Sequence, residues 1–202
     1  MTLRAPVKTT ALFLFAAILA WVSYSVMARK AHQIKWTLCF KENVKVCTDL
    51  IVSGNETTHD LAADLNNRGH AYVNSGDYDQ AIKDFGAAIQ LEPTDYRAYS
   101  NRGAAHYKNA EYDEALKDYD SALKLAPSDA ATLNNRASLY AMKHEYIKAI
   151  QDFDKAINLQ PDWPSLYCSR SALKRKIGNR IGGDEDAVKA KSLGETSECI
   201  VH

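Results

Sequence analysis

The sequence predicts an all-α protein built from repeated helix pairs, and three observations support that prediction. The triplet Asn-Arg-Gly at positions 67–69 recurs 34 residues later at 101–103, and again as Asn-Arg-Ala at 135–137. A period between about 20 and 50 residues indicates a repeat architecture. Apolar residues within each copy follow helical spacing. Each copy also closes on a helix-stopping proline, at Pro93, Pro127 and Pro161.

The composition is that of a globular protein with no charge bias. The 202 residues include 25 basic and 25 acidic side chains, and 46% of the chain is hydrophobic. A balanced charge gives no argument for nucleic acid as a partner. The hydrophobic content is too high for a disordered tail.

The N-terminus predicts export. Arg4 and Lys8 precede an apolar run over 11–22, and small residues stand at the two positions read by a signal peptidase before a cut after Ala28. This order is typical of a secretory signal peptide over 1–28. A retained membrane anchor and a buried helix are the alternatives, since 11–28 is barely long enough to span a bilayer. We expect an exported, periplasmic protein or one anchored to the inner membrane.

The segment 29–61 is predicted to form an N-terminal capping segment. Cys39 and Cys47 stand eight residues apart, and apolar residues at helical spacing predict a helix over roughly 44–53. In an oxidising compartment the two thiols would form a disulfide. The alternative is two buried free thiols. The spacing, without nearby histidines or further cysteines, does not suit a zinc site, and no metal is expected.

Each copy contains two helices packed through small residues. In the first copy one helix ends near Ser75, and the next runs from Tyr78 towards Pro93. Gly69 and Ala81 let these helices approach closely, while Tyr72 and Phe85 fill the space beside them. The equivalent packing residues in the next copies are Gly103, Ala115, Tyr119, Ala149 and Phe153.

The pattern of Gly69, Tyr72, Ala81, Phe85 and Pro93 at a period of 34 resembles the tetratricopeptide repeat. Three copies match, over 62–95, 96–129 and 130–163, and a degraded capping copy follows over 164–197. The resemblance implies a right-handed superhelix of antiparallel helix pairs. It also implies a concave groove lined by the first helix of each pair, which binds peptide or protein partners.

One departure from the family recurs in every copy. Arginine precedes the small residue, where the family usually has an apolar residue, and an aspartate follows 16 residues later. We expect these residues to form an Arg–Asp ladder within or between helix pairs; the alternative is that the arginines bind an anionic partner. The pairs are Arg68 with Asp84, Arg102 with Asp118, Arg136 with Asp152, and Arg170 with Asp186.

The family's geometry assigns polar residues of the first helices to the groove. They are Asn66, His70, Asn74, Arg97, Asn101, Tyr107, Lys108, Asn134, Asn135 and Arg175. Such a surface suits an extended or helical peptide with some negative charge. One subgroup of the family grips chaperone tails by their terminal carboxylate, and of its five clamp positions only Asn101 matches, so that role is disfavoured.

No catalytic site or cofactor is predicted. The sequence contains no HExxH, phosphate-binding loop or CxxC motif. His106 stands where the other copies have Tyr72 and Tyr140, which favours a packed side chain. Cys168 and Cys199 flank the last helix pair at neighbouring ends, and a disulfide between them is expected, with free thiols as the alternative.

The sequence therefore predicts a non-catalytic scaffold that binds protein or peptide partners and no nucleic acid. The alternatives are a self-associating assembly factor and an accessory subunit of a membrane-bound enzyme complex.

Overall fold

The structure is a computed structural model that describes residues 44–52, 57–196 and 199. Within these residues all regular structure is helical, and no strand is present. The predicted signal segment, 1–28, and Cys39 lie outside the described residues. None of the described helices is both long enough and apolar enough to cross a membrane.

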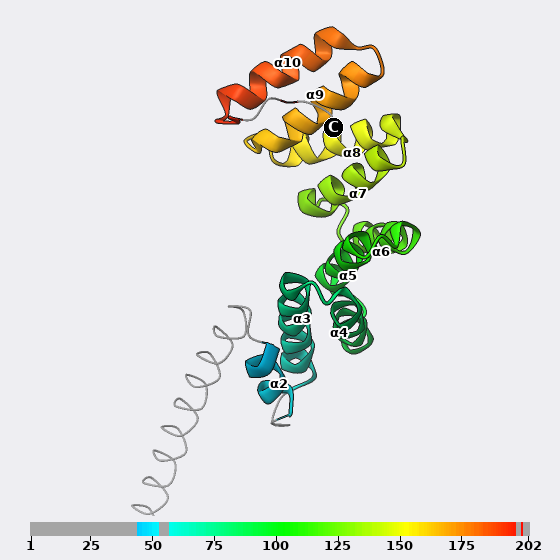
Figure 1. The fold of residues 1–202 in the computed structure, drawn as a ribbon, viewed down its shortest axis with the longest axis vertical. Coiled ribbons are helices and arrows are strands. Elements are labelled where there is room, and N and C mark those ends of the chain that lie inside the picture. Colours follow the sequence, from blue (N-terminus) through cyan, green and yellow to red (C-terminus); the bar gives the residue numbers. More distant parts are fainter. Residues whose placement is uncertain (1–43, 53–56, 197–198, 200–202) are drawn as a thin grey trace, which may run out of the picture.

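Four helix pairs follow a short N-terminal helix, α2 (Val44–Val52). The first helix of each pair packs against the second, each second helix packs against the next pair, and α2 packs against α3. The result is an elongated stack, so the predicted all-α fold of repeated helix pairs is confirmed (Figure 1). The pairs are α3 (Thr58–Ser75) with α4 (Tyr78–Leu91), α5 (Tyr96–Lys108) with α6 (Tyr112–Leu125), α7 (Ala130–Met142) with α8 (Tyr146–Leu159), and α9 (Pro164–Lys176) with α10 (Arg180–Ser192).

The two helices of a pair meet at the small residues of the repeat. A Cβ atom added to Gly69 would lie 2.6 Å from the ring of Phe85, and one added to Gly103 would lie 2.8 Å from the ring of Tyr119. Both rings are almost completely buried. At these two positions the aromatic ring occupies the space of a side chain, so any larger residue would force the ring to shift.

The fourth pair replaces this contact with a hydrogen bond. Ser171 occupies the glycine position, is fully buried, and donates its hydroxyl to the carbonyl oxygen of Gly183 at 2.7 Å. A Cβ atom on Gly183 would lie 2.9 Å from the carbonyl oxygen of Ser171. Small residues on both sides bring α9 and α10 together without a large ring between them.

The first helix of the array begins earlier than the predicted repeat boundary at 62. Thr57 accepts a hydrogen bond from the backbone N–H of Asp60, and Asp60 accepts one in return from the backbone N–H of Thr57. This capping box satisfies two backbone donors at the helix start. As a result α3 has 18 residues, whereas α5 has 13.

The turn between the helices of a pair passes through the left-handed backbone region once in every repeat. Gly76 and Gly178 have φ values of 80° and 89°, and the intervening repeats place Ala110 and His144 there, at 60° and 62°. Glycine adopts this conformation without steric cost, whereas a side chain disfavours it. The two central turns therefore hold strain that the outer turns avoid.

Candidate partner-binding surface

The first helices of the first three pairs line up along one side of the stack. α3 contacts α5, and α5 contacts α7, although each belongs to a different pair. The amide of Asn101 donates to the side-chain oxygen of Asn66 at 3.3 Å. Thr132 donates its hydroxyl to the carboxylate of Asp129 at 2.6 Å and accepts a hydrogen bond from the hydroxyl of Ser100 at 2.7 Å. Polar side chains from consecutive repeats are thus brought together, as the groove prediction requires.

The other predicted groove residues differ in how available they are. His70 is exposed, with its ring edge against Phe85, and Asn134 and Asn135 are partly buried neighbours. Arg97, Asn74 and Lys108 are exposed. Of these exposed groups, Arg97 also lies 3.4 Å from the carboxylate of Asp95.

Tyr107 and Arg175 already have partners within the chain. Tyr107 packs edge-on against Tyr112, next to a core cluster that contains Tyr119. Arg175 donates to Asp184 at 2.8 Å. The structure therefore places these two side chains in intramolecular contacts, which makes them less available to a ligand than the sequence suggested.

Cys199 occupies part of the fourth repeat's share of this surface. Cys168 stands at the repeat position of Asn134, and a disulfide bond joins it to Cys199. Arg175 also donates to the carbonyl oxygen of Cys199 at 3.2 Å. The open part of the surface is consequently formed by α3, α5 and α7.

At the N-terminal end of the stack, Cys47 on α2 is buried and disulfide-bonded.

All four predicted Arg–Asp pairs meet within their own helix pair. Each arginine donates from Nε and Nη2 to the two oxygens of one carboxylate, at 2.6–2.9 Å. The aspartates are buried. Paired, charge-assisted bonds of this kind are strong and orientation-specific. The bond to Asp118 is the main reason that the pKa of Arg102 is raised above its ordinary value.

The ladder also runs between repeats, as one form of the prediction allowed, but through two aspartates that the sequence did not single out. Arg136 donates from Nη1 to Asp120 in the preceding helix pair, and Arg170 does the same to Asp154, each at 2.6 Å. The sequence does contain a signal for these contacts, because an aspartate also lies 16 residues before Arg136 and before Arg170. Arg68 instead donates to Thr48 on α2 at 3.4 Å.

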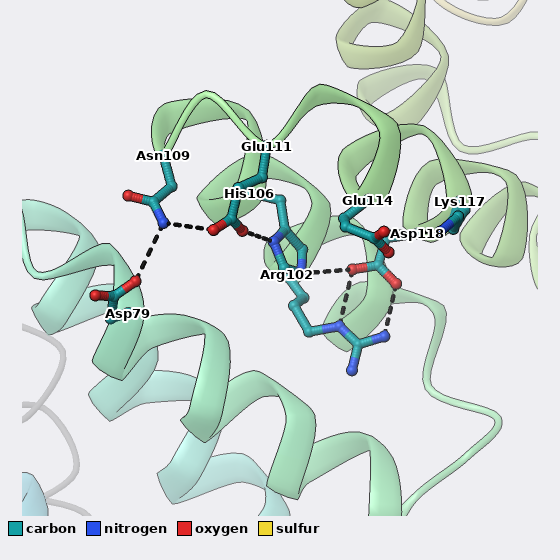
Figure 2. Close-up of polar contacts among 8 residues, drawn as sticks. All are labelled: Asp79, Arg102, His106, Asn109, Glu111, Glu114, Lys117 and Asp118. Carbon is teal, nitrogen blue, oxygen red and sulfur yellow. Dashed lines mark hydrogen bonds and ion pairs between the residues drawn. The ribbon is translucent and has the colours of Figure 1, made fainter.

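A polar network replaces the tyrosine of the neighbouring repeats around His106 (Figure 2). The imidazole Nδ1 lies 2.5 Å from Glu111, and Nε2 lies 3.8 Å from the carboxylate of Asp118. Asn109 donates to Asp79 of the preceding pair and to Glu111. The network ties two repeats together, and His106 is a largely enclosed side chain, as its position in the repeat predicted.

The described residues contain no group of three or more side chains arranged to hold a metal ion. Two surface hollows have charged walls. One, of about 350 Å³, lies beside Glu111 and Lys143, and the other, of about 480 Å³, lies beside Asp120, Arg136 and Lys155. Pockets for small molecules are mostly lined by apolar side chains. The walls found here instead contain several charged side chains.

Comparison with known proteins agrees with this architecture. The family model described as tetratricopeptide repeat matches residues 66–130 and 105–165. No curated protein matches the sequence. Among solved structures, MamA from Desulfovibrio magneticus RS-1 superposes with a TM-score of 0.69 at 21% identity, covering 83% of this chain and 97% of that one. At this identity the likeness shows the fold alone.

Two further structures have the same fold. A tetratricopeptide repeat protein from Parabacteroides merdae has a TM-score of 0.62 at 27% identity, covering 68% of this chain and 55% of that one. The first such repeat domain of Spaghetti (RPAP3), solved with the HSP90 peptide SRMEEVD, has a TM-score of 0.58 at 19% identity, covering 59% of this chain and 98% of that one.

The fold and the polar face of its first helices define a helical-repeat solenoid, a class of protein that is generally non-catalytic and serves in protein interaction. Over residues 66–165 the chain belongs to the tetratricopeptide repeat family.

Proposed function

We propose that this protein is a non-catalytic scaffold that binds an extended segment of a protein partner along α3, α5 and α7. The observation that carries the proposal is that the partly exposed amides of Asn66 and Asn101 meet across two repeats, and that Ser100 beside them bonds the buried Thr132 of the next repeat. Amides can donate to and accept from a peptide backbone at the same time. A rigid stack also loses little conformational entropy when it binds.

The exposed cations give the partner a charge preference. Arg97 and Lys108 are exposed on α5, near the middle of the open surface. They favour a segment with some negative charge over a basic one. The structure of the Spaghetti domain with the peptide SRMEEVD supports the proposal, because it shows this fold holding an acidic segment in another protein.

We further propose that the protein acts in the bacterial cell envelope. The apolar segment after Arg4 and Lys8 supports export, whether it is cut or kept as an anchor. The disulfide between Cys168 and Cys199 supports an oxidising compartment. Intact-mass measurement on the exported protein, with and without reductant, would report both the cut after Ala28 and the disulfides.

The binding proposal is tested by capturing partners from envelope extracts with the wild-type protein and with the double variant Asn66→Ala/Asn101→Ala. We expect the variant to lose a partner that the wild type retains. The matched control is Gln151→Ala, which removes an exposed amide from a second helix, α8, and should capture the same partner as wild type. Equal capture by all three proteins would contradict the proposed surface.

Self-association is the second candidate function, and the C-terminal end of the stack favours it. Ile181 and Val188 on α10 are 76% and 71% exposed. Apolar exposure at the end of a stacked array is typical of a surface that meets another subunit. Sedimentation of the purified protein would show a mass that rises with concentration if this surface self-associates. The variant Ile181→Lys/Val188→Lys should then remain monomeric.

A further inference from the structure

The four ladder arginines differ in what meets Nη1, the nitrogen that does not face the aspartate of their own pair. Arg136 and Arg170 each direct Nη1 to a carboxylate of the preceding helix pair, at 2.6 Å. In the part of the chain that the structure describes, no helix pair precedes Arg68, which directs Nη1 to the hydroxyl of Thr48 on α2. An oxygen atom therefore fills this position at three of the four arginines.

Arg102 is the exception. The residue 16 positions before it is Gly86, which stands where the next repeats have Asp120 and Asp154. A Cβ atom on Gly86 would lie 3.6 Å from Nη1 of Arg102, so a side chain at this position would point at the guanidinium. Among the described residues, the hydrogen bonds of Arg102 go to Asp118, from Nε and Nη2 (Figure 2).

The missing partner leaves the guanidinium more open than its counterparts. The side chain of Arg102 is 27% exposed, against 14–18% for the other three arginines. Its positive charge is permanent, since the pKa of Arg102 is raised above an already high value, mainly by the hydrogen bonds to Asp118. A partly buried charged donor gains free energy when an acceptor reaches it.

The equivalent positions show which chemical group fits there. Asp120 and Asp154 are 52% and 48% exposed while bonded to their arginines, so the carboxylate approaches from the solvent side. Beside Arg136 the surface is hollowed by about 480 Å³, which shows that there is room next to this position in the neighbouring repeat. At Arg102 the equivalent position is Gly86, which has no side chain to occupy the place that the carboxylate takes in the next repeats.

We propose that the notch formed by Arg102 and Gly86 is a docking site for a carboxylate of a protein partner, which completes the ladder in place of the missing aspartate. The partner is an acidic segment, because the protein itself places aspartate at the two equivalent positions. Glu114, the other acid near Arg102, is paired with Lys117 at 2.7 Å, which reduces its repulsion of an incoming carboxylate. The site uses α4 and α5 and is separate from the amide-lined face of the first helices.

The test is a titration of the full-length protein with the capped peptide acetyl-Ala-Asp-Ala-Asp-Ala-amide, followed by the NMR signal of the Arg102 Nε–H group. The same peptide with asparagine in place of aspartate, and inorganic phosphate, are the comparison probes. Gly86→Asp supplies the missing carboxylate from within the chain. Gly86→Ala is its matched control, because it removes the glycine without adding an acceptor.

We expect the acidic peptide to shift the Arg102 signal of the wild type and of Gly86→Ala saturably. In Gly86→Asp its affinity should fall about tenfold, the value of one charge-assisted hydrogen bond. An unmoved Arg102 signal in the wild type, or equal affinity in the two variants, would overturn the proposal. A response as large with the asparagine peptide or with phosphate would overturn it as well, because the site would then not select carboxylate.

A second variant keeps the proposal testable if Gly86→Asp does not fold. Asp120→Gly removes the acceptor of Arg136 and recreates the same notch one repeat further on. The acidic peptide should then shift the Arg136 signal, which stays unmoved in the wild type. Absence of this new response would contradict the proposal. That outcome is independent of whether the partner-capture experiment supports binding along α3, α5 and α7.

Discussion

Single residues decide how closely the helices approach and how the pairs are held together. The ring of Tyr119 fills the space beside Gly103 that a side chain would need. In the same helix pair, Arg102 is hydrogen-bonded to the carboxylate of Asp118. One contact is steric and the other is electrostatic. Their separate contributions to stability can be measured with two substitutions.

Gly103→Ala is expected to destabilise the protein by about 1–3 kcal/mol, because the added Cβ would overlap the ring of Tyr119 and force the helices apart. Its control is Gly86→Ala, also within a helix, where the added Cβ meets nothing closer than 3.6 Å. This control should be stabilised by about 1 kcal/mol through helix propensity. Urea unfolding of both variants measures the difference, and equal effects would refute the steric explanation.

Asp118→Ala is expected to destabilise the protein by about 2–3 kcal/mol, because it leaves the guanidinium of Arg102 partly buried without its carboxylate. The control Glu114→Ala breaks a pair with Lys117 in which both side chains are more than half exposed, and it should melt with the wild type. If Asp118→Ala also melted with the wild type, the ladder would have no structural role.

At the scale of the helix pair, two of the turns between helices contain backbone strain that glycine would remove. All four turns pass through the left-handed region at the same repeat position, yet only the outer two use glycine. The C-terminal helix ends are satisfied by the same backbone hydrogen bonds in each case, for example from Glu111 to His106. The conformation is therefore imposed by the helix pair, and the residue adapts to it.

Ala110→Gly is expected to stabilise the protein by about 0.5–1 kcal/mol, since glycine removes the steric penalty at positive φ but adds some flexibility to the unfolded chain. The control is Ala104→Gly in the middle of α5, which should be destabilised by about 1 kcal/mol. Thermal unfolding separates the two. A loss of stability in Ala110→Gly would mean that the turn is not strained.

At the scale of the whole molecule, ion pairs link consecutive helix pairs, whereas a disulfide bond stabilises the C-terminal end of the stack. Arg136 and Asp120 join the third pair to the second, and Arg170 and Asp154 join the fourth pair to the third. Beyond the fourth pair, Cys199 is tied to Cys168 of α9 by a disulfide. A terminal repeat lacks a neighbour to cover it. Cys199 packs against the core of the last repeats and provides part of that cover.

Cys199→Ser is expected to lower the free energy of unfolding by about 3 kcal/mol, the usual effect of losing a disulfide that closes a loop of this length. The released tail should be cut after Lys191 at lower trypsin concentrations than in the wild type. Reduction of the wild-type protein should produce the same cleavage pattern. An unchanged pattern in both cases would show that the disulfide does not hold the tail.

The sequence by itself revealed the repeat architecture. Close packing of helix pairs requires small and large residues at fixed positions, and these recur with a period of 34. Positions such as Gly69 and Phe85 thereby predicted the fold and its stacking. The spacing of Arg102 and Asp118 predicted their contact, since it joins neighbouring positions of antiparallel helices.

Only the tertiary structure decided which of these groups remain available. Tyr107 and Arg175 look like groove residues in sequence, but packing between helices and the chain end occupies them. The ion pair between Arg136 and Asp120 joins two repeats. Comparison with that pair shows that Gly86 lacks the carboxylate which would face Arg102. Such contacts depend on how one helix pair is placed against the next, and this placement is set by the packing of many side chains together.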